Sequence, residues 1–357
     1  MSNQNGKLKI FSTFSGIGGF ELGIENALGK ENIEIVGISE IDKYAVNIYE
    51  KHYPKHINFG DITRIKAKDL PYFDMLCGGF PCQDLSIAGK RAGLTGKRSG
   101  LFYEIIRIAE EKQPYIILLE NVKGLLNSSK GWDFANVLLE MDGIGYDIEW
   151  QLLNSKDFGV PQNRERVFII GHLRGKSWKP VFSIGENSGE DDEVQRDKKE
   201  KRTWVPCLST RYGQRWTDEG YIKQRLKIEI PSEQQDNRVY NSEGLSPCLD
   251  IRHKPKIITH SLYPRSGNPK QGGTGHLSKE DGSSYCLDCG NMQAIETKSS
   301  IRRLTPIECE RLQAFPDNWT QYGADGKLIS NTQRYKCLGN SITTSVVEEI
   351  IKRIEWK

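Results

Sequence analysis

The first half of the chain alternates between short apolar runs and segments with helical spacing. Uninterrupted apolar runs predict strands over residues 8–14, 33–40, 73–79, 115–122 and 166–173. Apolar residues at every third or fourth position predict helices over residues 20–28, 42–52 and 99–112. Strands that are apolar throughout and alternate with helices are typical of an α/β fold, in which both faces of a mostly parallel sheet are covered.

The pattern changes after residue 174. Residues 175–300 are rich in Gly, Ser, Asn and Asp and contain short β-type runs, which predicts a smaller β-rich region. Helical spacing returns over 305–315 and 341–356, and we expect the last helix to pack on the first domain. We therefore divide the chain into an α/β domain of residues 1–174 and 331–357, a β-rich region of residues 175–300, and a connecting hinge of residues 301–330.

Composition excludes several classes of protein. The net charge of +3, from 50 basic and 47 acidic residues, excludes a uniformly basic binder but not a local basic surface. No apolar run approaches the roughly 20 residues that span a bilayer. The N-terminus lacks the apolar core of a signal peptide. We therefore expect a cytoplasmic protein without a membrane partner.

The eight cysteines are scattered along the chain, which argues against a disulfide framework. Only Cys286 and Cys289 form a Cys-x-x-Cys pair, and no second such pair or nearby pair of histidines accompanies it. Because a structural zinc site normally has four ligands, we predict no metal.

A glycine-rich turn follows the first predicted strand. Gly16, Gly18 and Gly19 lie between that strand and a helix, where backbone can approach a ligand closely. The turn is not a complete Gly-x-Gly-x-x-Gly, because Glu21 takes the third position, so a pyrophosphate is less favoured. Glu40 ends the second strand, where carboxylates accept hydrogen bonds from ribose hydroxyls. The combination fits an adenosine ligand without phosphates, and the alternative is a purely structural turn.

Three more candidate side chains follow predicted strands. Cys82 comes after Gly78-Gly79-Phe80-Pro81, and a thiol at the carboxyl end of a strand is a candidate nucleophile. Glu120, followed by Asn121, ends the next strand and places a carboxylate at the same edge. Asp61 is a candidate acceptor for an adenine amino group. The structural alternatives are a buried cysteine, a turn-capping Glu and a helix N-cap.

Two basic segments complete the set. Arg164 and Arg166 occupy alternate positions before a strand, so their side chains point to one side and can bind a phosphate or a carbonyl. The segment 83–100 combines glycines, which allow mobility, with four basic residues, which can contact phosphates. A solvated surface loop is the alternative for this segment.

In this order the motifs closely resemble the C5-cytosine-specific DNA methyltransferase family of bacterial or phage type. The matching segments are 14–23, 39–45, 60–63, 78–89, 118–126, 158–171, 302–316 and 335–342. The resemblance implies a Rossmann-like domain that binds S-adenosyl-L-methionine (SAM), with a mostly parallel sheet. It also implies that residues 175–300 form a smaller, β-rich target recognition domain.

The resemblance also implies the roles of the reacting groups. Cys82 attacks C6 of a cytosine, Glu120 contacts N3 and Asn121 shapes that pocket. Arg166, supported by Arg164, holds the base carbonyl and a nearby phosphate.

SAM is the implied cofactor and S-adenosyl-L-homocysteine its product. The residues implied to bind it are Phe14, Gly16, Gly18, Gly19, Glu40, Ile41, Asp61, Ile62, Pro81, Leu101, Asn340 and Ser341. Ile41 departs from the family, whose members often carry an aromatic residue there.

Double-stranded DNA is the implied substrate, from which the cytosine must be flipped out of the helix. We expect the segment 83–100 to be a loop that closes over the flipped base. The residues implied to contact DNA are Gln83, Ser86, Lys90, Arg91, Lys97, Arg98 and Gln162. We expect a monomer associated with the nucleoid, with a restriction endonuclease of the same specificity as a candidate partner.

Three alternative functions remain open at this point. The first is an RNA cytosine-5 methyltransferase on the same scaffold. The second is a regulator that binds SAM or DNA without catalysis, which the presence of Cys82, Glu120 and Arg166 disfavours. A nicotinamide oxidoreductase is the least favoured, since it leaves the thiol and carboxylate unexplained.

Overall fold

The computed structural model describes residues 6–81, 100–184, 259–261, 277–289, 293–296 and 301–356. Several predicted site residues therefore lie outside the described residues, namely Cys82, Gln83, Ser86, Lys90, Arg91, Lys97 and Arg98.

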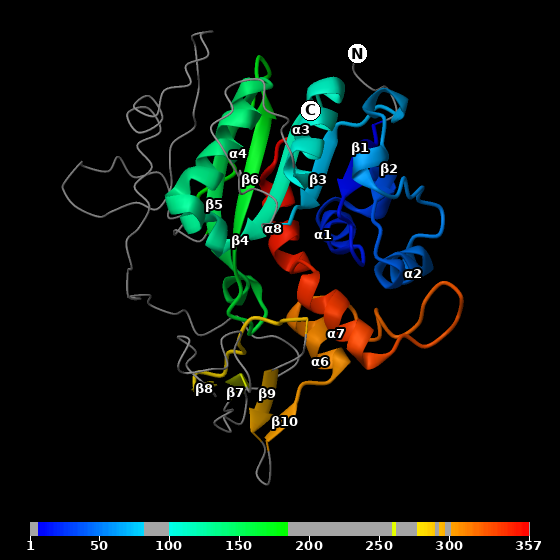
Figure 1. The fold of residues 1–357 in the computed structure, drawn as a ribbon, viewed down its shortest axis with the longest axis vertical. Helices are drawn as coiled ribbons and strands as arrows, with labels where there is room; N and C mark the ends of the chain where they lie inside the picture. Colours follow the sequence, from blue (N-terminus) through cyan, green and yellow to red (C-terminus); the bar gives the residue numbers. More distant parts are fainter. Residues whose placement is uncertain are drawn as a thin grey trace, which may run out of the picture.

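A six-stranded sheet forms the centre of the larger domain (Figure 1). Its strands are β1 (Leu8–Thr13), β2 (Ile33–Ser39), β3 (Met75–Gly79), β4 (Ile116–Val122), β5 (Tyr146–Asn154) and β6 (Glu165–Leu173). They lie in the order β2-β1-β3-β4-β6-β5. The first four pair in parallel, and β6 runs antiparallel to both of its neighbours. The predicted mostly parallel α/β fold is confirmed.

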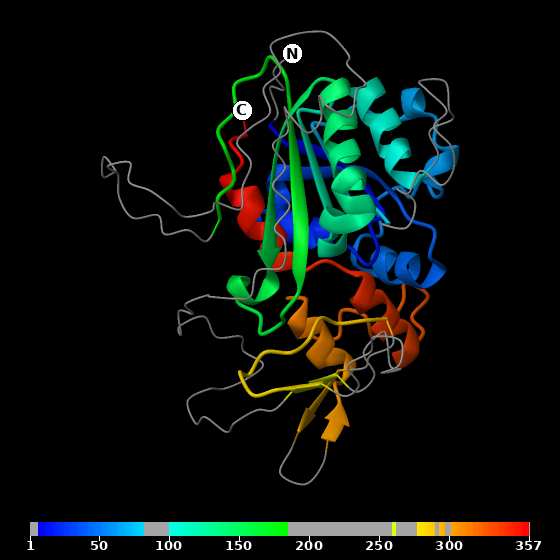
Figure 2. The same ribbon diagram turned by 60° about the vertical axis from the view of Figure 1, so that its left-hand side comes forward.

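Helices cover both faces of this sheet (Figure 2). The helices on one face are α1 (Gly19–Leu28), α2 (Lys43–His52) and α8 (Thr344–Arg353). The helices on the other face are α3 (Leu101–Lys112) and α4 (Trp132–Gly143). Alternation along β4 explains the two layers, because Ile116 and Leu118 join the first cluster whereas Ile117 and Leu119 join the second.

The last helix packs against α1, as predicted. A Cβ atom on Gly23 would lie 2.6 Å from the Cβ of Val347, so only glycine allows this approach of α1 and α8. The C-terminal segment therefore returns to the first helix of the chain.

A second, smaller sheet lies beyond the end of the central sheet (Figure 1). Its strands are β7 (Thr259–Ser261), β8 (Leu277–Lys279), β9 (Gln293–Glu296) and β10 (Ile301–Arg303), all paired antiparallel. The helices α6 (Pro306–Leu312) and α7 (Asn331–Asn340) follow the smaller sheet in sequence and lie between the two sheets in space (Figure 1). A separate β-rich region is thus confirmed, and through β10 it extends past residue 300.

Short 3₁₀ helices occupy the connections. Their bounds are Lys30–Asn32, Ile62–Arg64, Ala67–Asp69, Lys123–Gly131 and Ser155–Phe158. Within the described part of the chain, no helix has the length and apolar character needed to cross a membrane.

Some elements were not predicted from the sequence. The pattern did not indicate α4, β5 or α7. Helix α7, with sequence NTQRYKCLGN, is mostly polar, because it packs between other elements through only a few side chains. Residues 181 and 182, assigned to the β-rich region, lie instead against β5, where their backbone N–H groups donate to the Glu149 carboxylate at 3.0–3.1 Å.

Glu21 is a fully buried carboxyl group in the first turn of α1. Burial outweighs the nearby hydroxyls of Ser12 and Tyr49 and raises the pKa of Glu21 to about 7. The folded protein therefore holds this proton more tightly than the unfolded chain, whose pKa is near 4.5. The resulting stability is present at low pH and is lost as the pH rises through 7.

We predict that Glu21→Gln removes this pH dependence. Between pH 5 and pH 8 the free energy of unfolding of the parent should fall by roughly 2–3 kcal/mol more than that of the variant. Urea denaturation at both pH values measures the difference. Parallel changes in the two proteins would show that Glu21 does not titrate in this range.

Candidate active site

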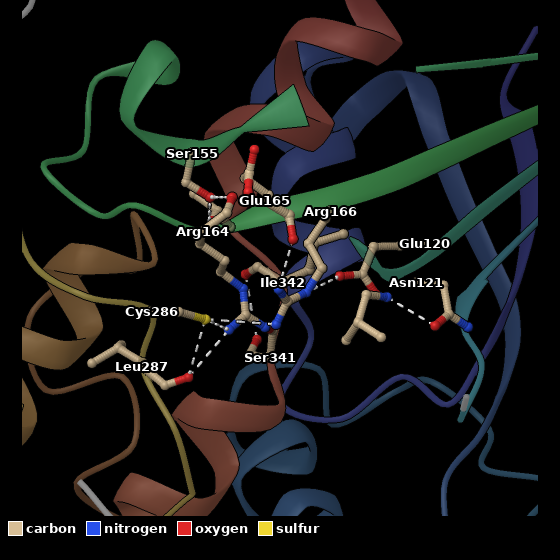
Figure 3. Close-up of polar contacts among 12 residues, drawn as sticks. Glu120, Asn121, Ser155, Arg164, Glu165, Arg166, Cys286, Leu287, Ser341 and Ile342 are labelled. Carbon is tan, nitrogen blue, oxygen red and sulfur yellow. Dashed lines mark hydrogen bonds and ion pairs between the residues drawn. The ribbon is translucent and has the colours of Figure 1, made fainter. Parts of the chain in front are cut away.

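A carboxylate and a guanidinium face each other at the carboxyl end of β4. The Glu120 Oε1 lies 2.9 Å from the Arg166 Nε, and both side chains are largely buried (Figure 3). The antiparallel register of β4 and β6, with Val122 opposite Arg166, brings the two residues together. A Cβ on Gly79 of the adjacent β3 would lie 3.0 Å from the Glu120 Oε2. Glycine at that position therefore leaves room for the carboxylate.

Asn121 holds the segment that leads to Cys82. Its buried side chain donates from Nδ2 to the Phe80 carbonyl at 2.8 Å, while its Oδ1 accepts the Val122 N–H at 2.8 Å. Cys82 is two residues beyond Phe80 in the sequence. Asn121 thus fixes the backbone next to Glu120 and immediately before the predicted nucleophile.

Arg164 lies in the interior and joins three parts of the chain (Figure 3). Its guanidinium donates to the Ser341 carbonyl at 2.5 Å, to the Gly339 carbonyl at 3.3 Å and to the Leu287 carbonyl at 3.4 Å. Burial and the neighbouring Arg166 charge lower the pKa of Arg164. With these partners Arg164 is held inside the protein and does not reach solvent.

Gln162 is also enclosed by protein. Its side chain is fully buried, donates from Nε2 to the Leu312 carbonyl at 2.8 Å and accepts the Leu287 N–H at 2.9 Å. The amide of Gln162 thus connects the β-rich region to α6. The side chain has no exposed surface for the DNA contact implied by the sequence. We therefore assign Gln162 to the internal framework.

Glu40 connects the two loops at the ends of β1 and β2. Its Oε2 accepts the Gly16 N–H at 2.8 Å, and its Oε1 accepts the N–H groups of Ile41 and Asp42, each at 2.8 Å. Gly16 and Gly18 adopt positive φ angles of 57° and 89°, which explains the glycines of this turn. A carboxylate has about four acceptor sites, and these N–H groups use three of those of Glu40.

The C-terminal segment closes on the same turn. A Cβ on Gly19 would lie 2.7 Å from the Ile342 Cγ2 and 3.1 Å from the Ser341 Oγ. Asn340, at the end of α7, is exposed beside it. The structure thus brings Ser341 to the glycine turn, a contact between residues more than 300 positions apart.

The other predicted cofactor residues differ in their exposure. Ile41 is 74% exposed, so an apolar side chain is available next to Glu40 to cover a flat ring. Phe14 adopts a positive φ of 52° and is half-buried. Ile62 is buried, and Leu101 at the start of α3 is half-buried. Pro81 is exposed.

Asp61 caps the short helix Ile62–Arg64. Its Oδ1 accepts the Thr63 N–H at 3.0 Å and the Thr63 hydroxyl at 2.8 Å, and these bonds lower the pKa of Asp61. The N-cap alternative is therefore realised, although the second oxygen of Asp61 still faces outward toward Arg64 at 3.6 Å. Asn58 ties this loop to Glu40, because it accepts the N–H groups of both Glu40 and Gly60.

Two contributors were missed by sequence reasoning. Lys336 on α7 pairs with Asp42 at 2.6 Å, which links the C-terminal segment to the loop after Glu40. Cys286 lies with its Sγ 3.3 Å from the Arg164 Nη1 and 3.8 Å from the Arg166 Nη2. Local sequence carries no signal for either contact, because both join segments more than 100 residues apart.

Comparisons with known proteins agree with this geometry. A family model described as C-5 cytosine-specific DNA methylase matches residues 8–356. The chain is 35% identical to the orphan methyltransferase M.SPRI of Bacillus phage SPR, over 98% of both chains. It is 32% identical to the type II methyltransferase M1.ScrFI of Lactococcus lactis subsp. cremoris, over 99% of this chain and 79% of that one.

A solved structure has the same fold. The S. pombe Dnmt2 methyltransferase superposes with a TM-score of 0.60 at 20% identity, covering 97% of this chain and 98% of that one. At this level of identity the likeness concerns the fold alone.

The two arginines should differ in their effect on stability. Arg164→Met leaves three carbonyls without their donor, so we predict that the free energy of unfolding falls by about 3 kcal/mol or more. Arg166→Met, the matched control, breaks the pair with Glu120 and the weaker contacts to the Glu165 carbonyl and the Cys286 sulfur, but it leaves these groups closer to solvent and should cost less, about 1–2 kcal/mol. Urea denaturation at pH 7 measures both. Equal losses would contradict the assignment of Arg164 to the framework.

Proposed function

Because the chain belongs to the family of C-5 cytosine-specific DNA methylases, we propose that it transfers a methyl group from SAM to C5 of a cytosine in double-stranded DNA. The observation that carries the proposal is the Glu120–Arg166 pair, at 2.9 Å, beside the backbone that Asn121 holds before Cys82. The glycine turn with Glu40 lies at the same edge of the sheet, so the two reacting molecules would meet there.

The chemistry explains why a thiol and a carboxyl group are needed together. C5 of cytosine is a poor nucleophile. When the Cys82 thiolate bonds to C6 and N3 gains a proton, the ring electrons move to C5, which can then take the methyl group. Loss of the C5 proton and of the proton gained at N3, with cleavage of the S–C6 bond, restores the aromatic ring and frees the thiolate. Each bond that forms on the protein is therefore broken again within one turnover.

Glu120 would bind the N3 edge of the base. Arg166 holds one carboxyl oxygen, while Gly79 leaves space around the other, so the orientation of the carboxyl group is fixed before the base arrives. Such preorganised groups stabilise developing charge without reorganising during the reaction. Arg166, 16% exposed, retains donors for the base carbonyl.

The residues around the glycine turn fit SAM. The remaining acceptor site of Glu40 suits a ribose hydroxyl, and exposed Ile41 suits the adenine ring. Ser341, held against Gly19, and Asn340 would close the site from the C-terminal side. When bound, SAM supplies the methyl group as an electrophile. We propose that the cofactor-binding residues predicted from the sequence bind SAM.

DNA binding rests on the segment after Cys82. The target carbon is enclosed in the duplex, and taking the base out costs a few kcal/mol. Lys90, Arg91, Lys97 and Arg98 would offset this cost through phosphate contacts. Ser86 would contact a further phosphate, and Gln83 the gap that the base leaves in the duplex. We propose that the β-rich region reads the sequence, as a target recognition domain.

An RNA substrate is the second candidate. The β-rich region favours DNA, because a duplex offers a major groove that such a module can read. The names of the relatives, an orphan and a type II methyltransferase, point the same way. A comparison of methyl transfer to duplex DNA and to total RNA decides between the two.

The proposed mechanism predicts a trapped covalent complex. Duplex DNA from diverse genomic templates, amplified with 5-fluorodeoxycytidine triphosphate, should retain the protein in the presence of SAM, because fluorine cannot leave C5 as a proton does. The complex should survive denaturing electrophoresis. Cys82→Ser should give no such band and no methyl transfer from labelled SAM.

SAM binding by calorimetry is the control for the folding of Cys82→Ser. Its dissociation constant should stay within about threefold of the parent, because Cys82 is not assigned to the cofactor site. Full turnover by this variant would exclude covalent catalysis by Cys82.

A further inference from the structure

A short segment of the β-rich region contacts both the residues that precede β6 and the end of α7. This segment, residues 286–289, packs directly against the end of α7, where a Cβ on Gly339 would lie 2.5 Å from the Asp288 carbonyl carbon. The Leu287 N–H and carbonyl are bound by Gln162 and Arg164. Cys289 donates from its thiol to the Asn340 Oδ1 at 2.8 Å.

The Cys286 thiol faces the guanidinium groups of Arg164 and Arg166 (Figure 3). Its thiol hydrogen points to the Leu287 carbonyl at 3.5 Å, which leaves the sulfur lone pairs for other donors. The donors that approach are Arg164 at 3.3 Å and Arg166 at 3.8 Å. The sulfur is therefore an acceptor placed between two guanidinium groups of like charge.

The two arginines depend on this sulfur to different degrees. Arg164 has three carbonyl partners and stays in place without the sulfur. Arg166 is held by the Glu120 carboxylate, by the backbone carbonyl of Glu165 and by the Cys286 sulfur. Among these contacts, Cys286 alone comes from the β-rich region.

We propose that Cys286 is a positioning residue, which orients Arg166 toward Glu120 and so couples the β-rich region to the reacting pair. The proposal rests on the proposed function. The two cysteines of the Cys-x-x-Cys pair then have different partners. Cys286 contacts Arg166, and Cys289 contacts Asn340 at the end of α7. A movement of the β-rich region on DNA would then change the Glu120–Arg166 geometry directly.

The test compares substitutions that keep or remove the acceptor. Cys286→Ser keeps it, whereas Cys286→Ala removes it and Cys286→Val removes it at similar volume. With saturating DNA and SAM, we expect kcat to fall about tenfold in the Ala and Val variants and to stay within about threefold in the Ser variant. The KM for SAM should change less than twofold in all three. Ser283→Ala, in the turn with Asp281 that precedes this segment, is the matched control and should behave as the parent.

A second measurement isolates the step that Arg166 serves. The single-turnover rate of covalent complex formation with 5-fluorocytosine duplex should fall in parallel with kcat. Parent-like kcat in the Ala and Val variants would overturn the proposal. So would losses that Ser fails to rescue and that accompany weaker SAM binding or a lower melting temperature, because these indicate a purely structural role. If the parent itself methylates no DNA, the proposed function fails instead.

Discussion

The buried guanidinium of Arg164 is the interaction on which the arrangement of the site depends. A charge in the protein interior is costly unless hydrogen bonds compensate for its lost hydration. Here the carbonyls of Leu287, Gly339 and Ser341 supply that compensation. Because the three carbonyls come from the β-rich region and from the C-terminal segment, the same bonds fix both of these parts against β6.

The order of the strands in the central sheet then determines which functional groups lie close together. The glycine turn and Glu40 follow β1 and β2, whereas Glu120 and Arg166 belong to β4 and β6, and β3 lies between the two groups. Since the carboxyl ends of parallel strands share one edge, a methyl donor and an acceptor base would be brought together there. The antiparallel β6 contributes its first residues to that edge, which explains why Arg166 can face Glu120.

Much of this arrangement could be predicted from the sequence, because it follows from local patterns. Continuous apolar runs located β1 to β4 and β6, and Glu40 and Glu120 were recognised by their positions after strands. The parts that could not be predicted depend on distant contacts. The polar helix α7 gives no periodic signal, and Cys286 acquires its place through contacts of its segment with distant residues, such as Asp288 against Gly339 and Leu287 with Gln162. Gln162 shows the converse, since a polar residue in a motif that implies DNA contact is used inside the protein.

The fate of the C5 proton tests most directly whether methyl transfer takes place at C5 through a reversible bond at C6. Duplex DNA with tritium at C5 of its cytosines would be incubated with the protein and with SAM carrying a carbon-14 methyl group. We predict that one tritium is released to water for each methyl group gained by the DNA. Methyl incorporation without tritium release would place the reaction at another atom of the base and contradict the assignment of Cys82 and Glu120.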